Sequence, residues 1–160
     1  ISKLYDHLHS YLQERCVAQF NADLRENWDQ LRKKALETAQ SWEREHEAEI
    51  IDHLMEESNS GGKAVLGVEP VLEALSFGQV HTLVLEHNLK LSGTACDEDR
   101  TLSTYLDTCP LCGQPMRQTE DLTEELVEEA VGQNAEVEHV FVSHEDFKPY
   151  GIGAFLRFTM

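Results

Sequence analysis

Residues 65–88 read VLGVEPVLEALSFGQVHTLVLEHN, and this stretch decides the fold. Residues 68–77 place apolar side chains three to four positions apart and are followed by Gly78, which predicts a helix with a glycine after its last turn. Residues 80–86 are rich in Val, Leu and Thr and predict a buried strand, and residues 63–67 predict a shorter strand before the helix. The stretch is typical of a strand–helix–strand unit.

The same alternation continues toward the C-terminus. Asp121 and Glu124 have the spacing of a capping box and open a helix that should end near Gly132. Residues 137–143 and 152–158 predict two further strands. Strands that alternate with helices of about three turns need crossover connections, so the sheet should be mixed or parallel and covered on both faces. The predicted fold class is α/β, as a three-layer α/β/α sandwich.

The N-terminal part has a different pattern. Residues 1–60 contain neither Gly nor Pro, and their apolar residues recur at three-to-four-residue steps, which predicts long amphipathic α-helices. Asn21–Asp23 should break this run and cap a second helix. We therefore expect residues 1–60 to be a helical extension or linker and residues 61–160 to be the α/β domain. Because the chain opens at Ile1 within a helical pattern, we expect it to be part of a longer polypeptide.

The composition limits the size and the location of the protein. With 160 residues, 41% of them hydrophobic, the chain can bury one ordinary core and a small appendage. No apolar run approaches the roughly 20 residues of a membrane span, and no signal peptide is recognisable. A soluble, cytoplasmic protein without membrane contact is expected.

The charge balance bears on the partners. Thirteen Lys and Arg stand against thirty Asp and Glu, for a net charge of -17. This charge repels phosphate backbones, so direct binding of nucleic acid is not expected. The sparse basic residues could cluster at one place, although a solvated helix face is the commoner meaning of such a run. These residues are Arg25, Arg32, Lys33 and Lys34.

The cysteines favour a metal site over a disulfide framework, because no signal peptide points to an oxidising compartment. Cys109-Pro110-Leu111-Cys112-Gly113 has the pattern of a zinc knuckle, since two thiolates two residues apart can reach one tetrahedral ion. Cys96 lies upstream at the sequence separation that the two knuckles of a zinc ribbon have, and Asp99 stands where the second cysteine of the first knuckle would be. We predict the set Cys96, Asp99, Cys109 and Cys112.

Two alternatives to this zinc site stay open. His87 precedes the cysteine-bearing segment and is a rival fourth ligand, because three sulfurs and one oxygen are an uncommon structural set. The other alternative is a decayed ribbon with free thiols in a loop.

Motifs for catalysis are missing from the sequence. It contains no Gly-x-Ser-x-Gly turn and no histidine pair with metalloprotease spacing. Residues 60–63, Ser-Gly-Gly-Lys, do not meet the Walker spacing and indicate a flexible linker. Apart from the zinc ligands, we expect no catalytic and no cofactor-binding residue.

Two segments carry a resemblance to a known family. Residues 65–88 resemble the third domain of the eukaryotic and archaeal class I peptide chain release factors and of Pelota. Residues 150–158, YGIGAFLRF, look like the closing segment of that domain, and an insertion at about residues 92–118 is similar to a small subdomain that some members carry. The long acidic helices before residue 60 look most like bacterial members. The resemblance implies an L7Ae/L30e-like domain, with residues 1–60 holding the end of a preceding domain and the first helix of this one.

The resemblance also implies a function. In that family, peptidyl-tRNA hydrolysis depends on a Gly-Gly-Gln loop in another domain, and Gly61-Gly62-Lys63 departs from it. The third domain is implied to be a non-catalytic protein-interaction domain in translation termination or ribosome rescue. Its implied partners are a translational GTPase or another ribosome-associated protein, and the other domains of the same polypeptide. An RNA-binding L7Ae-like domain and a zinc-dependent hydrolase are the alternatives.

Within the closing segment, the small residues Gly151 and Gly153 have a structural reason. They allow the backbone to lie close to a neighbouring helix, and glycine can adopt a positive φ where a strand begins. Arg157 either pairs with an acidic helix or is an edge charge on the last strand.

Overall fold

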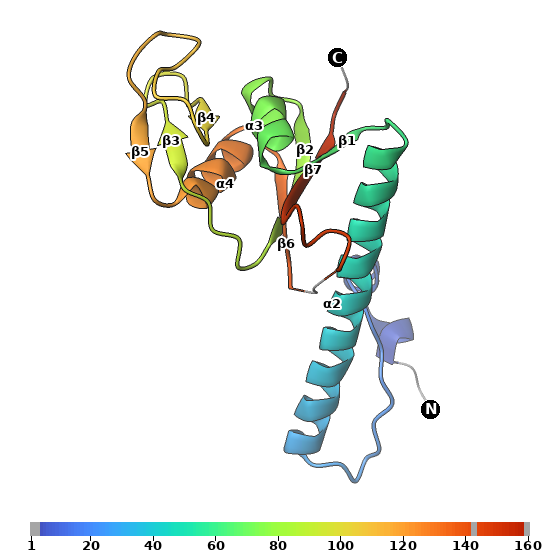
Figure 1. Cartoon of the computed structure of the whole chain (residues 1–160). Helices are drawn as coiled ribbons and strands as arrows, with labels where there is room; N and C mark the ends of the chain where they lie inside the picture. The colour runs from blue at the N-terminus through green and yellow to red at the C-terminus, as the bar shows by residue number, and fades with distance from the viewer. Residues whose placement is uncertain (1–3, 142–143, 159–160) are drawn as a thin grey trace. The chain divides into compact units, whose positions relative to one another are not determined.

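The computed structural model describes residues 4–141 and 144–158 (Figure 1). The chain separates into two compact units, Ile1–His46 and Glu47–Met160, and helix α2, Trp28–Asn59, runs from the first unit into the second. Within the described ranges, no helix is long and apolar enough to cross a membrane.

The first unit contains less helix than its sequence predicts. A 3-10 helix, η1, covers Leu4–His7, and α1 covers Ser10–Gln13, whereas residues 14–27 form no helix. The prediction of long helices before Asn21 is therefore wrong for the described residues, and residues 1–3 lie outside them. No described residue of this unit is buried, so the apolar stripe has no core to pack against, and short helices are marginal in water without one.

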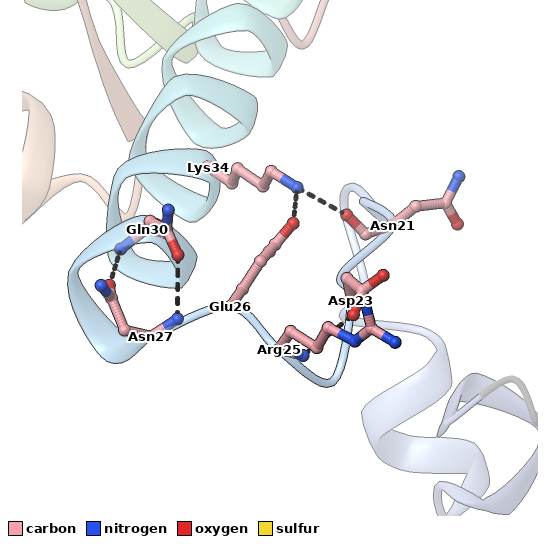
Figure 2. A network of polar contacts seen from close by, with 7 residues as sticks. All are labelled: Asn21, Asp23, Arg25, Glu26, Asn27, Gln30 and Lys34. Atoms are coloured by element: carbon pink, nitrogen blue, oxygen red, sulfur yellow. Dashed lines mark hydrogen bonds and ion pairs between the residues drawn. The ribbon is translucent and has the colours of Figure 1, made fainter.

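The start of α2 is fixed by a reciprocal cap that lies later in the chain than predicted (Figure 2). Asn27 Oδ1 accepts a hydrogen bond from the backbone N–H of Gln30 at 2.9 Å, and Gln30 Oε1 accepts from the N–H of Asn27 at 3.0 Å. This capping box satisfies N–H groups that a helix start leaves free. The prediction that Asn21–Asp23 caps the helix is wrong, because Asp23 accepts instead from the N–H of Arg25 at 2.9 Å.

The basic residues near this cap are partly neutralised. The Lys34 ammonium pairs with the Glu26 carboxylate and donates to the carbonyl oxygen of Asn21 at 3.3 Å (Figure 2). Lys33 lies 3.8 Å from Glu37. These pairings lower the positive potential that RNA binding at this helix would need.

The second unit contains one four-stranded sheet. Its strands are β1 (Ala64–Leu66), β2 (Val80–Glu86), β6 (Glu136–Val140) and β7 (Ile152–Leu156), in the order β1-β7-β2-β6 (Figure 1). β2 and β6 are parallel, and β7 runs antiparallel to both of its neighbours. The predicted strands therefore share one mixed sheet, as expected; residues 142–143, assigned to the third of them, lie outside the described part.

Helices cover both faces of this sheet. α3 (Val68–Ser76) and α4 (Leu122–Gly132) pack on one face, where Leu83 of β2 points. The C-terminal part of α2 packs on the other face, where its Leu54 lies in one cluster with Val84. Because adjacent residues of a strand point to opposite faces, β2 supplies both cores. The predicted three-layer α/β fold with a long helix before it is confirmed.

Both ends of α4 are capped. Asp121 Oδ1 accepts from the N–H of Glu124 at 3.1 Å, as the capping-box spacing predicted. At the other end, the Arg157 guanidinium donates to the carbonyl oxygens of Gln133 and Asn134 at 2.7 and 3.0 Å. Arg157 thus meets the free carbonyl groups of a helix end rather than an acidic side chain.

Candidate metal centre

Residues between β2 and α4 form a separate small sheet. Its strands are β3 (Gly93–Ala95), β4 (Leu102–Ser103) and β5 (Arg117–Thr119), antiparallel in the order β4-β3-β5. The insertion has a very small hydrophobic cluster of its own, Cys96, Cys109 and Met116, with Leu106 packed against it. A cluster of this size buries little apolar surface, so the insertion needs another source of stability.

The insertion brings the four predicted ligand residues together. One ligand atom from each of Cys96, Asp99, Cys109 and Cys112 lies within 4.8 Å of all the others. Cys96 Sγ is 3.6 Å from Cys112 Sγ, and Asp99 Oδ2 is 3.4 Å from Cys109 Sγ and 3.9 Å from Cys96 Sγ. A tetrahedral zinc ion with Zn–S bonds of about 2.3 Å holds its sulfurs roughly 3.8 Å apart. The observed spacings fit such an ion.

Two turns with the same backbone pattern position these four residues. In the first turn, Cys96 N–H donates to the Thr101 carbonyl at 2.9 Å and Arg100 N–H donates to the Cys96 carbonyl at 3.0 Å. In the second, Cys109 N–H donates to the Gln114 carbonyl at 2.8 Å and Gly113 N–H donates to the Cys109 carbonyl at 2.9 Å.

The two turns also share an unusual backbone conformation at the same position. Arg100 has φ +55° and Gly113 has φ +74°, each four residues after the first cysteine of its turn. Each turn therefore has the shape of a knuckle, with Asp99 in the place that Cys112 takes in the second one. A non-glycine residue in the left-handed region is uncommon, and Arg100 stands where a knuckle requires that conformation.

The thiols have different protonation preferences. The backbone N–H of Cys112 is the main cause that lowers the pKa of the Cys109 thiol, against the opposing effect of burial. Hydrogen bonding to the Asp99 carboxylate is the main cause that raises the pKa of Cys112 to about 12. The lowered pKa makes the Cys109 thiol easier to deprotonate, whereas Cys112 holds a proton that a bound metal would displace.

The other cysteine and the rival ligand lie outside this cluster. The His87 ring stacks on Phe141 with centroids 4.1 Å apart and is not among the residues whose ligand atoms converge. Cys16 belongs to the first unit, where its thiol donates to the carbonyl oxygen of Ala18 at 3.5 Å.

Some residues of the insertion escaped the sequence reasoning. Thr101 places its hydroxyl 3.6 Å from the Cys109 sulfur. Arg117 on β5 forms ion pairs with Glu125 of α4 at 2.7 Å and with Asp97 at 3.2 Å. Both contacts raise the pKa of the guanidinium, and the hydrogen bond to Glu125 contributes most. The two contacts join residues eight and twenty positions apart on different elements, so no helix or strand period could have shown them.

Comparisons with known proteins agree with this architecture. The family model described as eRF1 domain 3 matches residues 45–160. The C-terminal domain of a peptide chain release factor from Methanosarcina mazei is similar in structure, with a TM-score of 0.58 and 24% identity over 85% of this chain and 98% of that one. Pelota from Archaeoglobus fulgidus has a TM-score of 0.56 and 19% identity over 89% of this chain and 39% of that one.

A sequence relative supports the same comparison over a short stretch. A Protein pelota homolog from Natronomonas pharaonis is 51% identical over 39 residues, which cover 24% of this chain and 11% of that protein. The chain therefore spans only a minor part of the Pelota proteins that it matches, but nearly all of the release factor domain.

Proposed function

Because the chain belongs to the eRF1 domain 3 family, we propose that it is the partner-docking domain of a release-factor-like protein in translation termination or ribosome rescue. The observation that carries this proposal is the extent of the match. Residues 45–160 correspond to the second compact unit, which begins at Glu47, so the family resemblance and the folded sandwich coincide. Domain 3 in this family is a non-catalytic domain.

Its proposed partners are a translational GTPase or another ribosome-associated protein. A chain of net charge -17 suits a basic or mixed protein surface better than ribosomal RNA, since complementary charge steers association and like charge opposes it. We therefore propose no direct contact with nucleic acid. We also propose a cytoplasmic location without membrane contact, in keeping with a role in translation. The RNA-binding alternative would need a basic patch, and Lys33 and Lys34 are paired with acids.

In this proposal the chain itself catalyses no reaction. Residues 61–63 read Gly-Gly-Lys, so peptidyl-tRNA hydrolysis would need a Gly-Gly-Gln loop from another domain of the polypeptide. The hydrolase alternative needs a metal with an open coordination position. Four protein ligands that converge on one point match the closed coordination of a structural site instead.

We assign zinc to the Cys96, Asp99, Cys109 and Cys112 cluster on the basis of its spacing and its donor atoms. The ion would join the two knuckle turns and stabilise an insertion whose own apolar cluster is small. Its role is structural, and the insertion it holds would add to the docking surface.

The remaining assignments concern the parent protein. We propose that residues 1–60 hold the end of a preceding domain and the first helix of this one, because Tyr11, Phe20 and Trp28 near the start are exposed, whereas Leu54 near the end of α2 is buried in the sandwich. A bacterial source and membership of the L7Ae/L30e fold class stay predictions. The first is based on the acidic helix before residue 60, and the second on the family resemblance.

Deletion of residues 47–160 from the complete polypeptide tests this function. Intact and truncated proteins would be sedimented with ribosomes of the same organism and its purified translational GTPase. We expect the intact protein to bring the GTPase into the ribosomal fraction and the truncated protein to lose this recruitment. Equal recruitment by both, with the rest of the protein folded by circular dichroism, would refute the docking role.

A further inference from the structure

The outer edge of β6 is open. β6 is the last strand in the order β1-β7-β2-β6, and among the described residues no strand pairs with its other side. The Val140 carbonyl accepts the N–H of His87, in the loop after β2, at 2.9 Å, so the backbone groups of Val140 face β2. Because these groups alternate along a strand, Val137 and His139 direct their N–H and C=O groups away from the sheet.

A second contact supports this orientation. The N–H of Phe141, two residues beyond His139, points to the same side and donates to a carboxylate oxygen of Glu47 at 2.8 Å. A side-chain oxygen here takes the place that a carbonyl of a further strand would take. The edge at Val137 and His139 thus offers main-chain donors and acceptors in strand geometry.

The two faces of this edge differ in chemistry. Val140 is buried on the face that α2 covers. Glu136 and Glu138 lie four and two residues before it in the same strand, and alternate residues share a face, so both point to that side. Val137 packs toward α3 and α4, and His139 and Phe141 lie on its side.

Beyond Val137, the α3/α4 face of the edge ends in an exposed aromatic group. Phe141 is 66% exposed and stacks on His87 at 4.1 Å, and His139 meets His87 edge-on at 6.3 Å. One face of the edge is therefore acidic and the other aromatic.

We propose that the free edge of β6 is a docking site for an extended segment of a partner protein in which basic residues alternate with apolar ones. This inference rests on the proposed docking function and names the chemistry of the partner. An added strand would place Lys or Arg beside Glu136 and Glu138, and apolar side chains beside Phe141. A second copy of this chain does not fit, because it would oppose the same acids to each other.

Protection against aggregation explains only one face of this edge. Native edges are blunted by charged residues and short length, and Glu136 and Glu138 on a short β6 agree with that role. The exposed Phe141 on the opposite face does not protect the edge, and a docked apolar side chain would cover it.

The test uses a blocked synthetic peptide of alternating lysine and valine, titrated into the full chain and followed by amide hydrogen exchange. We expect Val137 and His139 amides to exchange fast in the free chain and to become protected when the peptide is bound. Glu138 and Val140 are internal controls, since their amides already face β2. Unchanged exchange at Val137 and His139 with peptide bound, or no peptide binding, would overturn the proposal.

Two variants at one position separate backbone from side chain. His139→Pro removes the outward N–H and leaves the β2 ladder, so peptide binding should weaken about tenfold or more. His139→Ala keeps the N–H and loses only the ring from the aromatic face, so it should weaken binding clearly less than His139→Pro does. Equal binding by both variants overturns the inference, and far-UV circular dichroism verifies that each is folded.

A peptide of alternating glutamate and valine serves as the charge control and should not bind. If the lysine peptide leaves the edge unprotected while the domain still recruits its GTPase, the edge inference fails and the proposed function stands. Loss of GTPase recruitment by the native domain would instead remove the proposed function.

Discussion

Replacing Cys109 with alanine is expected to abolish zinc binding by the chain, from one ion per chain to none. Cys109 is 1% exposed and is one of the four residues whose ligand atoms converge, so the remaining three cannot close a tetrahedral site without it. Structural zinc in small domains contributes on the order of 10 kcal/mol of apparent binding free energy at neutral pH. The insertion should therefore lose its folded structure, while the four-stranded sheet keeps its own cores.

Cobalt substitution measures this outcome. The native chain loaded with Co²⁺ should show the visible bands of a tetrahedral thiolate site, and the Cys109→Ala chain should not. Cys16→Ala is the matched control, because Cys16 belongs to the first unit and not to the cluster, and its spectrum should equal the native one. Native bands in the Cys109→Ala chain would contradict the assignment.

The pH dependence of metal binding has a definite sign. In the metal-free chain the pKa of Cys112 is raised to about 12, so this thiol carries a proton throughout the neutral range. A metal must displace that proton, and apparent affinity should fall about tenfold per pH unit of acidification for each proton released. Competition titrations at several pH values check this slope.

Replacing Gly153 with valine is expected to destabilise the sandwich by about 3 kcal/mol or more. A Cβ atom at Gly153 would lie 2.7 Å from Leu54 Cδ2, 3.0 Å from Leu66 Cδ2 and 3.0 Å from the Val65 carbonyl oxygen. The first contact is with α2, and the last is with the backbone of β1, which cannot move without losing its pairing with β7. Urea unfolding of the native and variant chains measures the change in the free energy of unfolding.

A second glycine supplies the control for this measurement. Gly132 ends α4, and a Cβ atom there would meet only the flexible end of Arg100 at 3.4 Å. Gly132→Ala should change stability by less than about 1 kcal/mol, in the stabilising direction because alanine favours helix. If Gly153→Val were as mild as Gly132→Ala, the close packing of α2 on β7 would be wrong.

The core of the domain could be predicted because its signals are local. β2 covers Val80–Glu86, as its run of Val, Leu and Thr predicted, and α3 covers Val68–Ser76, close to the residues 68–77 that apolar periodicity and Gly78 predicted. The role given to the last glycines also holds. Gly151 has φ +64°, and Gly153 lies against the neighbouring helix.

The N-terminal unit shows where periodicity fails. Residues 14–27 keep helical spacing in sequence but form no helix, because no described residue of this unit is buried and a helix here would have no core to pack against. The start of α2 depends on the reciprocal hydrogen bonds of Asn27 and Gln30. These residues have capping-box spacing in the sequence, but Asn21–Asp23 was the more conspicuous candidate for the cap.

For the candidate site, spacing predicted which side chains converge but not how. Asp99 lies beside the three cysteines and His87 does not, since the first turn repeats the knuckle geometry with Arg100 at positive φ. The strands of the insertion are two or three residues long, too short to show a period. The open edge of β6 depends on sheet order, which no local pattern determines.

Calorimetric titration of the chain into a purified, GTP-bound translational GTPase of the same organism tests the docking role most directly. We predict a one-to-one complex that weakens as salt is raised, and no binding of ribosomal RNA under the same conditions, because the chain carries a net charge of -17. Binding of the RNA without binding of the GTPase would contradict a protein-docking domain.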